Sequence, residues 1–173
     1  FIREAIDSII AQDIGLEHIQ LILVDDGSPD GSGTICDEYA AQYPDNIFVV
    51  HKENGGLSSA RNAGLEYAQA EFVNFTDPDD KLAPNVISSV CKFYEEYGDK
   101  TDVVSIPLKF FDARTGDHIL NYKYKNGTRL VNLKEECNCP QMQIASSFIR
   151  TTCFEHLRFD TRLTTAEDAQ VLQ

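Results

Sequence analysis

An apolar run followed directly by an acidic turn occupies residues 21–28, which read LILVDDGS. A short, uninterrupted apolar run is typical of a strand buried on both faces of a parallel sheet. A second strand-like stretch, FVNF at residues 72–75, leads into the acidic sequence TDPDD at residues 76–80. Ligands of open α/β sheets bind beyond the carboxyl ends of the strands. The two stretches therefore predict a parallel sheet whose acidic strand ends face a ligand crevice.

Helical and strand patterns alternate around these two runs. Apolar residues recur at helical spacing in four segments, and a third apolar run marks another strand. The expected helices cover residues 1–12, 35–43, 60–68 and 86–97, and the expected strands cover residues 21–24, 47–50 and 72–75. This alternation predicts an α/β fold with a mostly parallel, Rossmann-like sheet that is flanked by helices.

The pattern changes after Asp99. Residues 103–111 and 118–124 have the composition of two strands, and the turn sequence RTGD lies between them at residues 114–117. This arrangement predicts an antiparallel hairpin. Because neither an internal repeat nor a long linker marks a second domain, we expect residues 1–173 to form one domain. Residues 1–99 would supply its nucleotide-binding half, and residues 100–173 its substrate-facing half.

The charge of the chain limits its partners. The net charge is −13, with 42% hydrophobic and 25% charged residues, which is the composition of an ordinary globular domain. Nucleic acids and anionic membrane surfaces are bound by clustered Lys and Arg, so neither is expected as the main partner. A small anionic ligand is still compatible with this charge, because a metal ion, a helix N-terminus or one Arg can hold a diphosphate.

The cysteines and the chain ends indicate the cellular setting. Five cysteines without a C-x-x-C spacing suggest neither a disulfide framework nor a tetrathiolate zinc site, so we expect a cytoplasmic protein with reduced thiols. No apolar run approaches the ~20 residues of a membrane helix. Contact with the inner face of a cell membrane would therefore come from regions outside this sequence. Both ends fall inside helical patterns, which predicts a piece of a longer protein.

The acidic turn at residues 77–80 is a candidate metal site. Asp77 and Asp79 are two residues apart in an extended turn, so their carboxylates can face the same side. Hard carboxylate oxygens suit Mg²⁺ or Mn²⁺, and such an ion completes its shell with waters and substrate phosphates. The alternative is a solvated turn that caps the next helix, because Asp and Pro favour turns in any case.

A glycine turn lies between the two acidic turns. Residues 51–64 read HKENGGLSSARNAG, so Gly55 and Gly56 lead into a helix that carries Arg61 in its first turns. The exposed backbone N–H groups and the guanidinium of Arg61 could bind a diphosphate or hold the neighbouring carboxylates in place. In the plainer alternative, the glycines only turn the chain and Arg61 forms a structural pair with an Asp.

Four motifs in this order resemble the family 2 glycosyltransferases with the GT-A fold. The motifs are VDDGS at residues 24–28, NGGLSSARNAG at residues 54–64, DPDD at residues 77–80, and the pair Glu167-Asp168. The resemblance extends from the first helix to the last residue. It implies the inverting transfer of a sugar from a nucleoside-diphosphate donor, with UDP-sugars as the expected donors, to a hydroxyl acceptor. It also implies Mn²⁺ or Mg²⁺ on the diphosphate.

The resemblance also implies roles for individual residues. Asp26 would contact the base or ribose of the donor, and Arg61 would brace the nucleotide side. Asp77 and Asp79 would form the D-x-D element, with Asp79 as the more direct metal ligand. Asp168 would be the general base that takes the proton of the acceptor hydroxyl. Without the resemblance, Glu167-Asp168 would be interpreted as the charged first turn of a helix.

The chain departs from the family pattern at both ends. Members of the family begin with a strand that lies in the middle of the sheet and ends in a Pro-x-Tyr-type turn, and this sequence starts just after it. The C-terminal region is also absent. A missing central strand would leave its neighbours unpaired.

The acceptor is indicated only by a weaker similarity. Residues 108–143 resemble family members that build bacterial surface polymers such as capsule, teichoic acid or O-antigen, so the expected acceptor is a carbohydrate, a polymer or a lipid-linked sugar. Two other functions stay open on the sequence alone. One is a nucleotidyltransferase that makes the activated sugar, and the other is a non-catalytic carbohydrate-binding relative.

Overall fold

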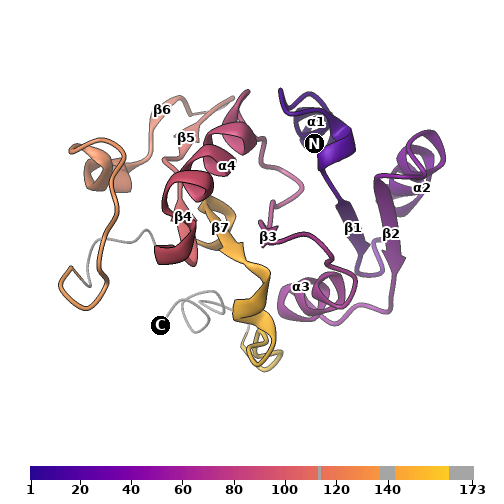
Figure 1. Ribbon diagram of the computed structural model, residues 1–173. Coiled ribbons are helices and arrows are strands. Elements are labelled where there is room, and N and C mark those ends of the chain that lie inside the picture. Colours follow the sequence, from indigo (N-terminus) through magenta and orange to yellow (C-terminus); the bar gives the residue numbers. More distant parts are fainter. Residues whose placement is uncertain (113, 137–142, 164–173) are drawn as a thin grey trace.

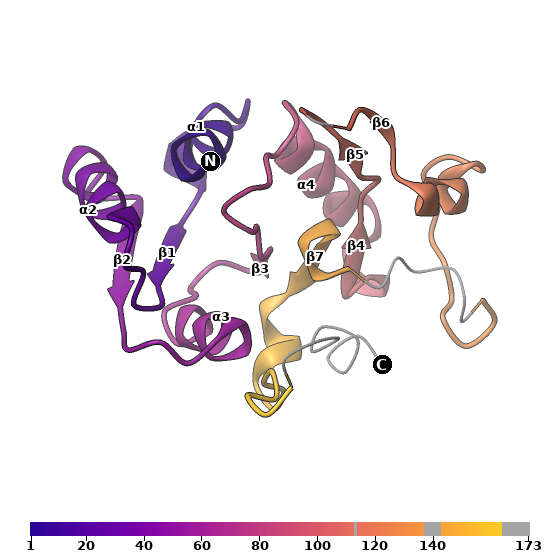
Figure 2. The ribbon, with the colours of Figure 1, turned by 180° about the vertical axis from the view of Figure 1, so that it is seen from behind.

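The computed structural model describes residues 1–112, 114–136 and 143–163. Figure 1 shows two groups of elements side by side, one built from the first third of the chain and the other from the rest, and Figure 2 shows the same division from behind. None of the helices in the described ranges is long and apolar enough to cross a membrane.

The first group is a parallel pair of strands with three helices. Its elements are α1 (Ile2–Ile10), the 3₁₀ helix η1 (Leu16–His18), β1 (Leu21–Asp25), α2 (Ser32–Gln42), β2 (Ile47–His51) and α3 (Leu57–Leu65). The register of β1 and β2 runs from Leu21↔Ile47 to Asp25↔His51. The helix–strand alternation predicted for this half is confirmed.

The core of the first group follows the helical spacing of its apolar residues. Ile6 of α1, Tyr39 of α2 and Ile47 of β2 are buried together. The Tyr39 hydroxyl donates a hydrogen bond of 2.6 Å to Asp7, so the one polar atom of this aromatic side chain has a partner. Helix α3 lies close to β1. A Cβ atom at Gly64 would be only 3.4 Å from Val24 Cγ2, so the absence of a side chain at Gly64 permits this packing.

The second group is an antiparallel sheet with one long helix. It contains β3 (Phe72–Val73), α4 (Val86–Tyr97), η2 (Gly98–Lys100), β4 (Val103–Ser105), η4 (Ile144–Ser146), β7 (Ser147–Arg150) and η5 (Thr151–Phe154). The strand order is β3-β7-β4, and both neighbours run antiparallel to β7. β7 is the buried centre of this sheet, with Ile149 and Phe148 in two apolar clusters on its two faces.

Arg150 joins the edges of the second group. Its guanidinium forms an ion pair with Glu71, donates a hydrogen bond of 2.9 Å to the Gly98 carbonyl oxygen and lies 5.0 Å from the centre of the Phe72 ring. The ring of Phe72 stacks on Tyr94, whose hydroxyl donates a hydrogen bond of 2.8 Å to the carbonyl oxygen of Phe148. Helix α4 is therefore attached to the sheet by polar contacts as well as by apolar packing.

The predicted hairpin exists but is shorter than expected. It consists of β5 (Lys109–Phe110) and β6 (Gly116–Asp117), paired antiparallel. The prediction that residues 118–124 form its second strand is wrong, because Ile119–Tyr124 is the 3₁₀ helix η3. The side chain of Asn121 accepts a hydrogen bond from the Leu108 N–H and donates one to the Leu108 carbonyl oxygen, at 3.1 and 2.6 Å. The Leu108 carbonyl oxygen also accepts a hydrogen bond of 3.1 Å from the His118 N–H, so the backbone pairing ends at His118 and the Asn121 side chain supplies the next contacts with Leu108.

His51, the last residue of β2, lies between two carboxylates. Its Nδ1 is 3.0 Å from Asp25 Oδ2 and its Nε2 is 2.9 Å from Asp37 Oδ1. The hydrogen bonds to Asp37 and Asp25 raise the pKa of His51 above its ordinary value. The Ser28 N–H and His51 hold the pKa of Asp25 below its ordinary value. The ring therefore joins the end of β1 to α2.

We expect Ile149→Ala to lower the free energy of unfolding by about 2–5 kcal/mol, because this 2%-exposed side chain fills the core and its loss leaves a cavity. Denaturant titration measures this change. Ile119→Ala removes the same atoms from a side chain that is 78% exposed, and it should change the stability by less than about 0.5 kcal/mol. Equal losses in the two variants would contradict the placement of the core.

We expect the contribution of His51 to stability to fall with rising pH. The pKa of the ring is higher in the folded state, so protonated His51 stabilises the fold below its unfolded pKa of about 6.5, and this stabilisation is lost as the pH rises through the folded value. The difference in unfolding free energy between wild type and His51→Gln should shrink between about pH 5.5 and about pH 8.5. A difference that stays constant over this range would refute the prediction.

The same pairing can be followed by NMR. Titration of the His51 ring should have a midpoint above about 6.5, the value of an unperturbed imidazole. Asp37→Asn should lower that midpoint, because Asp37 is the largest cause of the raised pKa.

Candidate functional site

A cleft of about 580 Å³ separates the two groups of elements. Its walls are mainly apolar and come from β1, β3 and facing sides of α1, α3 and α4. In the described part of the chain β1 pairs only with β2, and β3 only with β7, so one edge of each strand is left for the cleft.

Polar side chains gather at one end of the cleft. Four polar residues line the cleft here. They are Asp25 at the end of β1, Ser28 in the turn after it, Arg61 of α3, and Asp77 in the turn after β3. This end is the carboxyl end of both strands, where the sequence predicts a ligand crevice. Asp26 and Asp79 do not line the cleft itself but neighbour residues that do.

Asp26 is held by the glycine turn. Its Oδ1 accepts a hydrogen bond from the Gly55 N–H at 3.0 Å, and its Oδ2 accepts one from the Gly56 N–H at 2.7 Å. Lys52 forms an ion pair with the same carboxylate. Burial raises the pKa of Asp26, but the hydrogen bonds from Lys52, Gly55 and Gly56 outweigh this effect and hold the pKa below its ordinary value. Of the two roles predicted for the glycine N–H groups, the structure therefore shows the holding of a carboxylate.

Two glycines allow the Asp26 turn and the glycine turn to approach each other. Gly27 has a φ of +74°, and a Cβ atom there would lie 3.1 Å from the backbone nitrogen of Asn54. Gly56, directly before α3, has a φ of +81°. Residues other than glycine rarely adopt these φ values, so both positions require it.

Arg61 and Asp77 are brought together from α3 and the end of β3. Arg61 is 8% exposed, and its Nη2 is 3.6 Å from Asp77 Oδ1. The guanidinium also lies 5.4 Å from the centre of the Phe159 ring. The plainer alternative for Arg61, a structural pair with an Asp, is thus present, and it places a buried cation directly beside the first carboxylate of the D-x-D element.

Asn62, beside Arg61 in α3, makes a structural contact that the sequence analysis does not predict. Its side chain accepts a hydrogen bond from the Phe159 N–H at 2.9 Å and donates one to the Phe159 carbonyl oxygen at 2.8 Å. Asn62 thereby fastens the segment around Phe159 to α3. The only signal in the sequence is its place next to Arg61 in the motif, because an amide in a helix is usually exposed.

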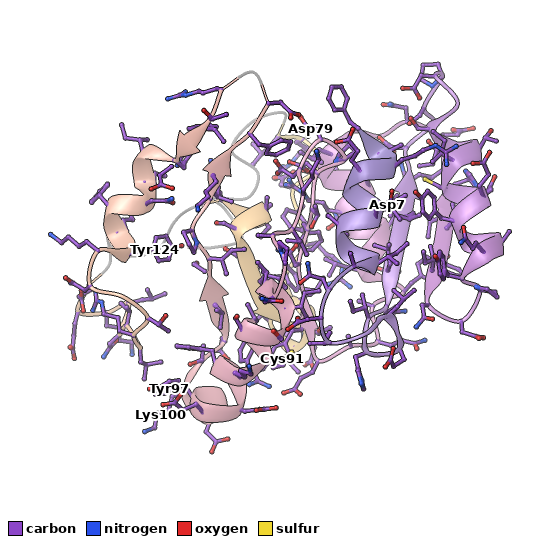
Figure 3. All side chains as sticks on the ribbon, turned by 90° about the horizontal axis from the view of Figure 1, so that it is seen from above. Asp7, Asp79, Cys91, Tyr97, Lys100 and Tyr124 are labelled. Atoms are coloured by element: carbon purple, nitrogen blue, oxygen red, sulfur yellow. The ribbon has the colours of Figure 1, made fainter. Side chains whose placement is uncertain are left out.

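The acidic turn is closed by its own backbone. The Asp80 N–H donates a hydrogen bond of 3.0 Å to the Asp77 carbonyl oxygen, while the Asp79 side chain is exposed. Burial, with the charges of Asp77 and Asp79, raises the pKa of Asp80. Figure 3 shows Asp79 between the α1 side of the molecule and the β5–β6 hairpin. Lys81, two residues after Asp79, contacts both of these parts. It forms an ion pair with Glu4 of α1 and lies 4.7 Å from the centre of the Phe111 ring, next to the hairpin.

The donor set for a metal ion is small. Within residues 1–112, 114–136 and 143–163, no three His, Cys, Asp or Glu side chains are grouped so that they could hold an ion. The role of Asp77 and Asp79 as metal ligands stays a prediction, in which phosphate and water oxygens would complete the shell, as is usual for Mg²⁺. Glu167 and Asp168 lie outside the described residues, and Asp168 is the predicted general base.

Relatives with known roles match nearly the whole chain. GgaB, a minor teichoic acid biosynthesis protein of Bacillus subtilis (strain 168), is 44% identical over 172 residues, which are 99% of this chain and 19% of GgaB. GgaA, named likewise and from the same organism, is 34% identical over 173 residues, which are 98% of this chain and 39% of GgaA. The chain thus spans about a fifth and two fifths of these two proteins.

Solved structures of S. aureus TarS have the same fold. The crystal structure of TarS 1–349 in complex with UDP-GlcNAc superposes with a TM-score of 0.84 at 26% identity, over 99% of this chain and 48% of that one. The complex with UDP has a TM-score of 0.78 at 24% identity. The predicted GT-A fold, an α/β arrangement with parallel strands, flanking helices and antiparallel strands, is therefore confirmed.

The family model described as glycosyl transferase family 2 matches residues 1–156. This range holds three of the four motifs that carried the resemblance, and it covers most of the 173 residues. The chain belongs to glycosyl transferase family 2.

Proposed function

We propose that the protein containing this chain transfers a sugar from a UDP-sugar donor to a hydroxyl acceptor with inversion. The observation that carries the proposal is the Arg61–Asp77 pair at the carboxyl end of β3, where a buried cation and an acidic turn meet at the mouth of the cleft. TarS structures of the same fold hold UDP and UDP-GlcNAc, which supports a uridine nucleotide as the donor.

In this proposal Asp77 and Asp79 hold Mn²⁺ or Mg²⁺. Three carboxylates lie within residues 77–80, and burial, together with the charges of Asp77 and Asp79, raises the pKa of Asp80. A divalent cation bound there would offset this repulsion. When bound, the ion neutralises negative charge that develops on the leaving diphosphate. Arg61 fixes Asp77 in place and adds positive charge on the nucleotide side, and Asp26 contacts the base or ribose.

Asp168 is proposed as the general base. Inversion by a single displacement requires a base on the face of the sugar opposite the leaving diphosphate, where it takes the proton of the acceptor hydroxyl as the glycosidic bond forms. The Asn62–Phe159 hydrogen bonds hold the segment that leads toward Asp168 against α3.

The proposed acceptor is a bacterial surface polymer or its lipid-linked precursor. The names of GgaB and GgaA refer to teichoic acid biosynthesis, and these proteins match the chain over almost its full length. Such an acceptor places the reaction at the cytoplasmic face of the cell membrane. Membrane contact would then come from other regions of the parent protein. A non-catalytic carbohydrate-binding relative is the competing function, and the general-base variant below separates it from a transferase.

Asp79→Asn in the full-length parent protein should weaken UDP binding at least tenfold in the presence of Mn²⁺, because the ion loses a charged ligand. Isothermal titration calorimetry with Mn²⁺ or with EDTA measures the effect. Wild type should also lose binding in EDTA. Asp45→Asn, which makes the same charge change at an exposed turn, should bind as wild type does. Equal affinity with and without metal would overturn the metal assignment.

Asp168→Asn should reduce kcat for sugar transfer by about 10²–10⁴-fold, because the acceptor hydroxyl loses its proton acceptor. Affinity for UDP should stay unchanged, since the base acts on the acceptor side. Asp99→Asn, at an exposed position, serves as the control for the lost charge. Unchanged turnover in Asp168→Asn would show that another group is the base, and an inactive wild type that binds UDP would favour the non-catalytic relative.

A further inference from the structure

We propose that Lys52 is a positioning residue that sets the affinity for the donor nucleotide by orienting the Asp26 carboxylate. The inference rests on the proposed function, in which Asp26 contacts the base or ribose. Lys52 itself would not touch the ligand.

The strand register places Lys52 opposite Asp26. β1 and β2 end at the pair Asp25↔His51, and the Lys52 N–H donates a hydrogen bond of 3.0 Å to the Asp25 carbonyl oxygen. The parallel pairing thus continues one step past the strands, where Lys52 and Asp26 form the next pair. Both side chains are largely shielded, with 22% and 18% exposed. An ion pair that is shielded to this extent is screened less than one on an open surface.

The ammonium group of Lys52 is committed to protein acceptors. It binds Asp26 Oδ1 and also donates a hydrogen bond of 2.6 Å to the carbonyl oxygen of Glu53. The second bond anchors the cation to the glycine turn, so the ammonium group is fixed from two sides. A cation that is held in this way orients a carboxylate and is poorly placed to follow a ligand.

Each oxygen of the Asp26 carboxylate has one donor of its own, and the two oxygens share the Gly55 N–H. Oδ1 accepts from Lys52 and from the Gly55 N–H at 3.0 Å. Oδ2 accepts from the Gly56 N–H at 2.7 Å and shares the Gly55 N–H at 3.1 Å. Three donors, Lys52, Gly55 and Gly56, thus serve a carboxylate with about four acceptor positions, which leaves capacity for one more donor, such as an N–H of a base or a ribose hydroxyl.

Loss of Lys52 would release Oδ1 from its charged partner. The carboxylate could then rotate, and its remaining acceptor position would no longer have a fixed direction. The uncompensated charge of Asp26 would also repel an anionic nucleotide at a short distance. Both effects weaken donor binding and leave the chemical step on the acceptor side unchanged, so they predict a change in KM without a change in kcat.

The test uses the full-length parent protein with UDP and Mn²⁺ as the binding probe and the UDP-sugar as the donor in turnover. Lys52→Met should raise the Kd for UDP and the donor KM about 10–100-fold, since a charge-assisted hydrogen bond in a shielded place is lost. kcat at saturating donor should stay within about twofold. Lys52→Arg keeps the charge and should recover most of the affinity. Lys92→Met, at an exposed position of α4, should leave UDP binding unchanged.

A double-mutant cycle shows whether Lys52 acts through Asp26. Asp26→Asn should weaken UDP binding, and Lys52→Met combined with Asp26→Asn should bind no more weakly than Asp26→Asn alone. Additive losses would mean that Lys52 acts by another route and would overturn the inference. Equal UDP affinity in wild type and folded Lys52→Met would overturn it as well.

Two further outcomes separate this inference from the function on which it rests. If wild type binds neither UDP nor the UDP-sugar, the proposed function fails. If Lys52→Met does not fold, as melting temperature and circular dichroism would show, Lys52→Gln takes its place. A folded Lys52→Gln variant with wild-type affinity then refutes the inference, and a loss of affinity that Lys52→Arg restores supports it.

Discussion

The parallel pairing of β1 with β2 is the constraint on which the rest of the site depends. Parallel strands end at the same edge of a sheet, so Asp25 faces His51 and Asp26 faces Lys52. Each carboxylate meets a basic side chain on the neighbouring strand. A shift of one residue in this register would turn every side chain of β1 to the opposite face and would break both pairs. The apolar sequence of the two strands thus fixes the electrostatics of the loops that follow them.

The charged residues near the cleft also differ in how deeply they are buried. Arg61 is buried and pairs with the carboxylate of Asp77, whereas Asp79 is exposed at the rim. Burying a guanidinium is costly unless it has a charged partner. The pair therefore makes the position of the acidic turn depend on the position of α3. Because α3 also carries Asn62, the helix holds the turn after β3 and the segment around Phe159 in one arrangement.

The parts of the fold that could be predicted are those set by periodic burial. The helices and strands of the first group follow from apolar spacing, and the acidic residues at the end of β1 follow from the geometry of parallel strands, whereas β3 pairs antiparallel with β7. Arg61 and Asp77 were both predicted as site residues, but their contact joins α3 to the turn after β3, and no local pattern reports it. The pairing of Lys52 with Asp26 depends in the same way on the strand register.

The hairpin shows why the second half was harder to predict. The aromatic composition of residues 118–124 is typical of a strand, but Ile119–Tyr124 is a 3₁₀ helix. The side chain of Asn121 in this helix forms hydrogen bonds with both backbone groups of Leu108. Asn62 does the same to Phe159. In both places one amide replaces a peptide unit of a neighbouring chain, because it offers one donor and one acceptor side by side. An aspartate of identical shape would turn two oxygens toward the backbone and oppose the carbonyl, so the difference of one nitrogen atom decides whether these segments stay joined.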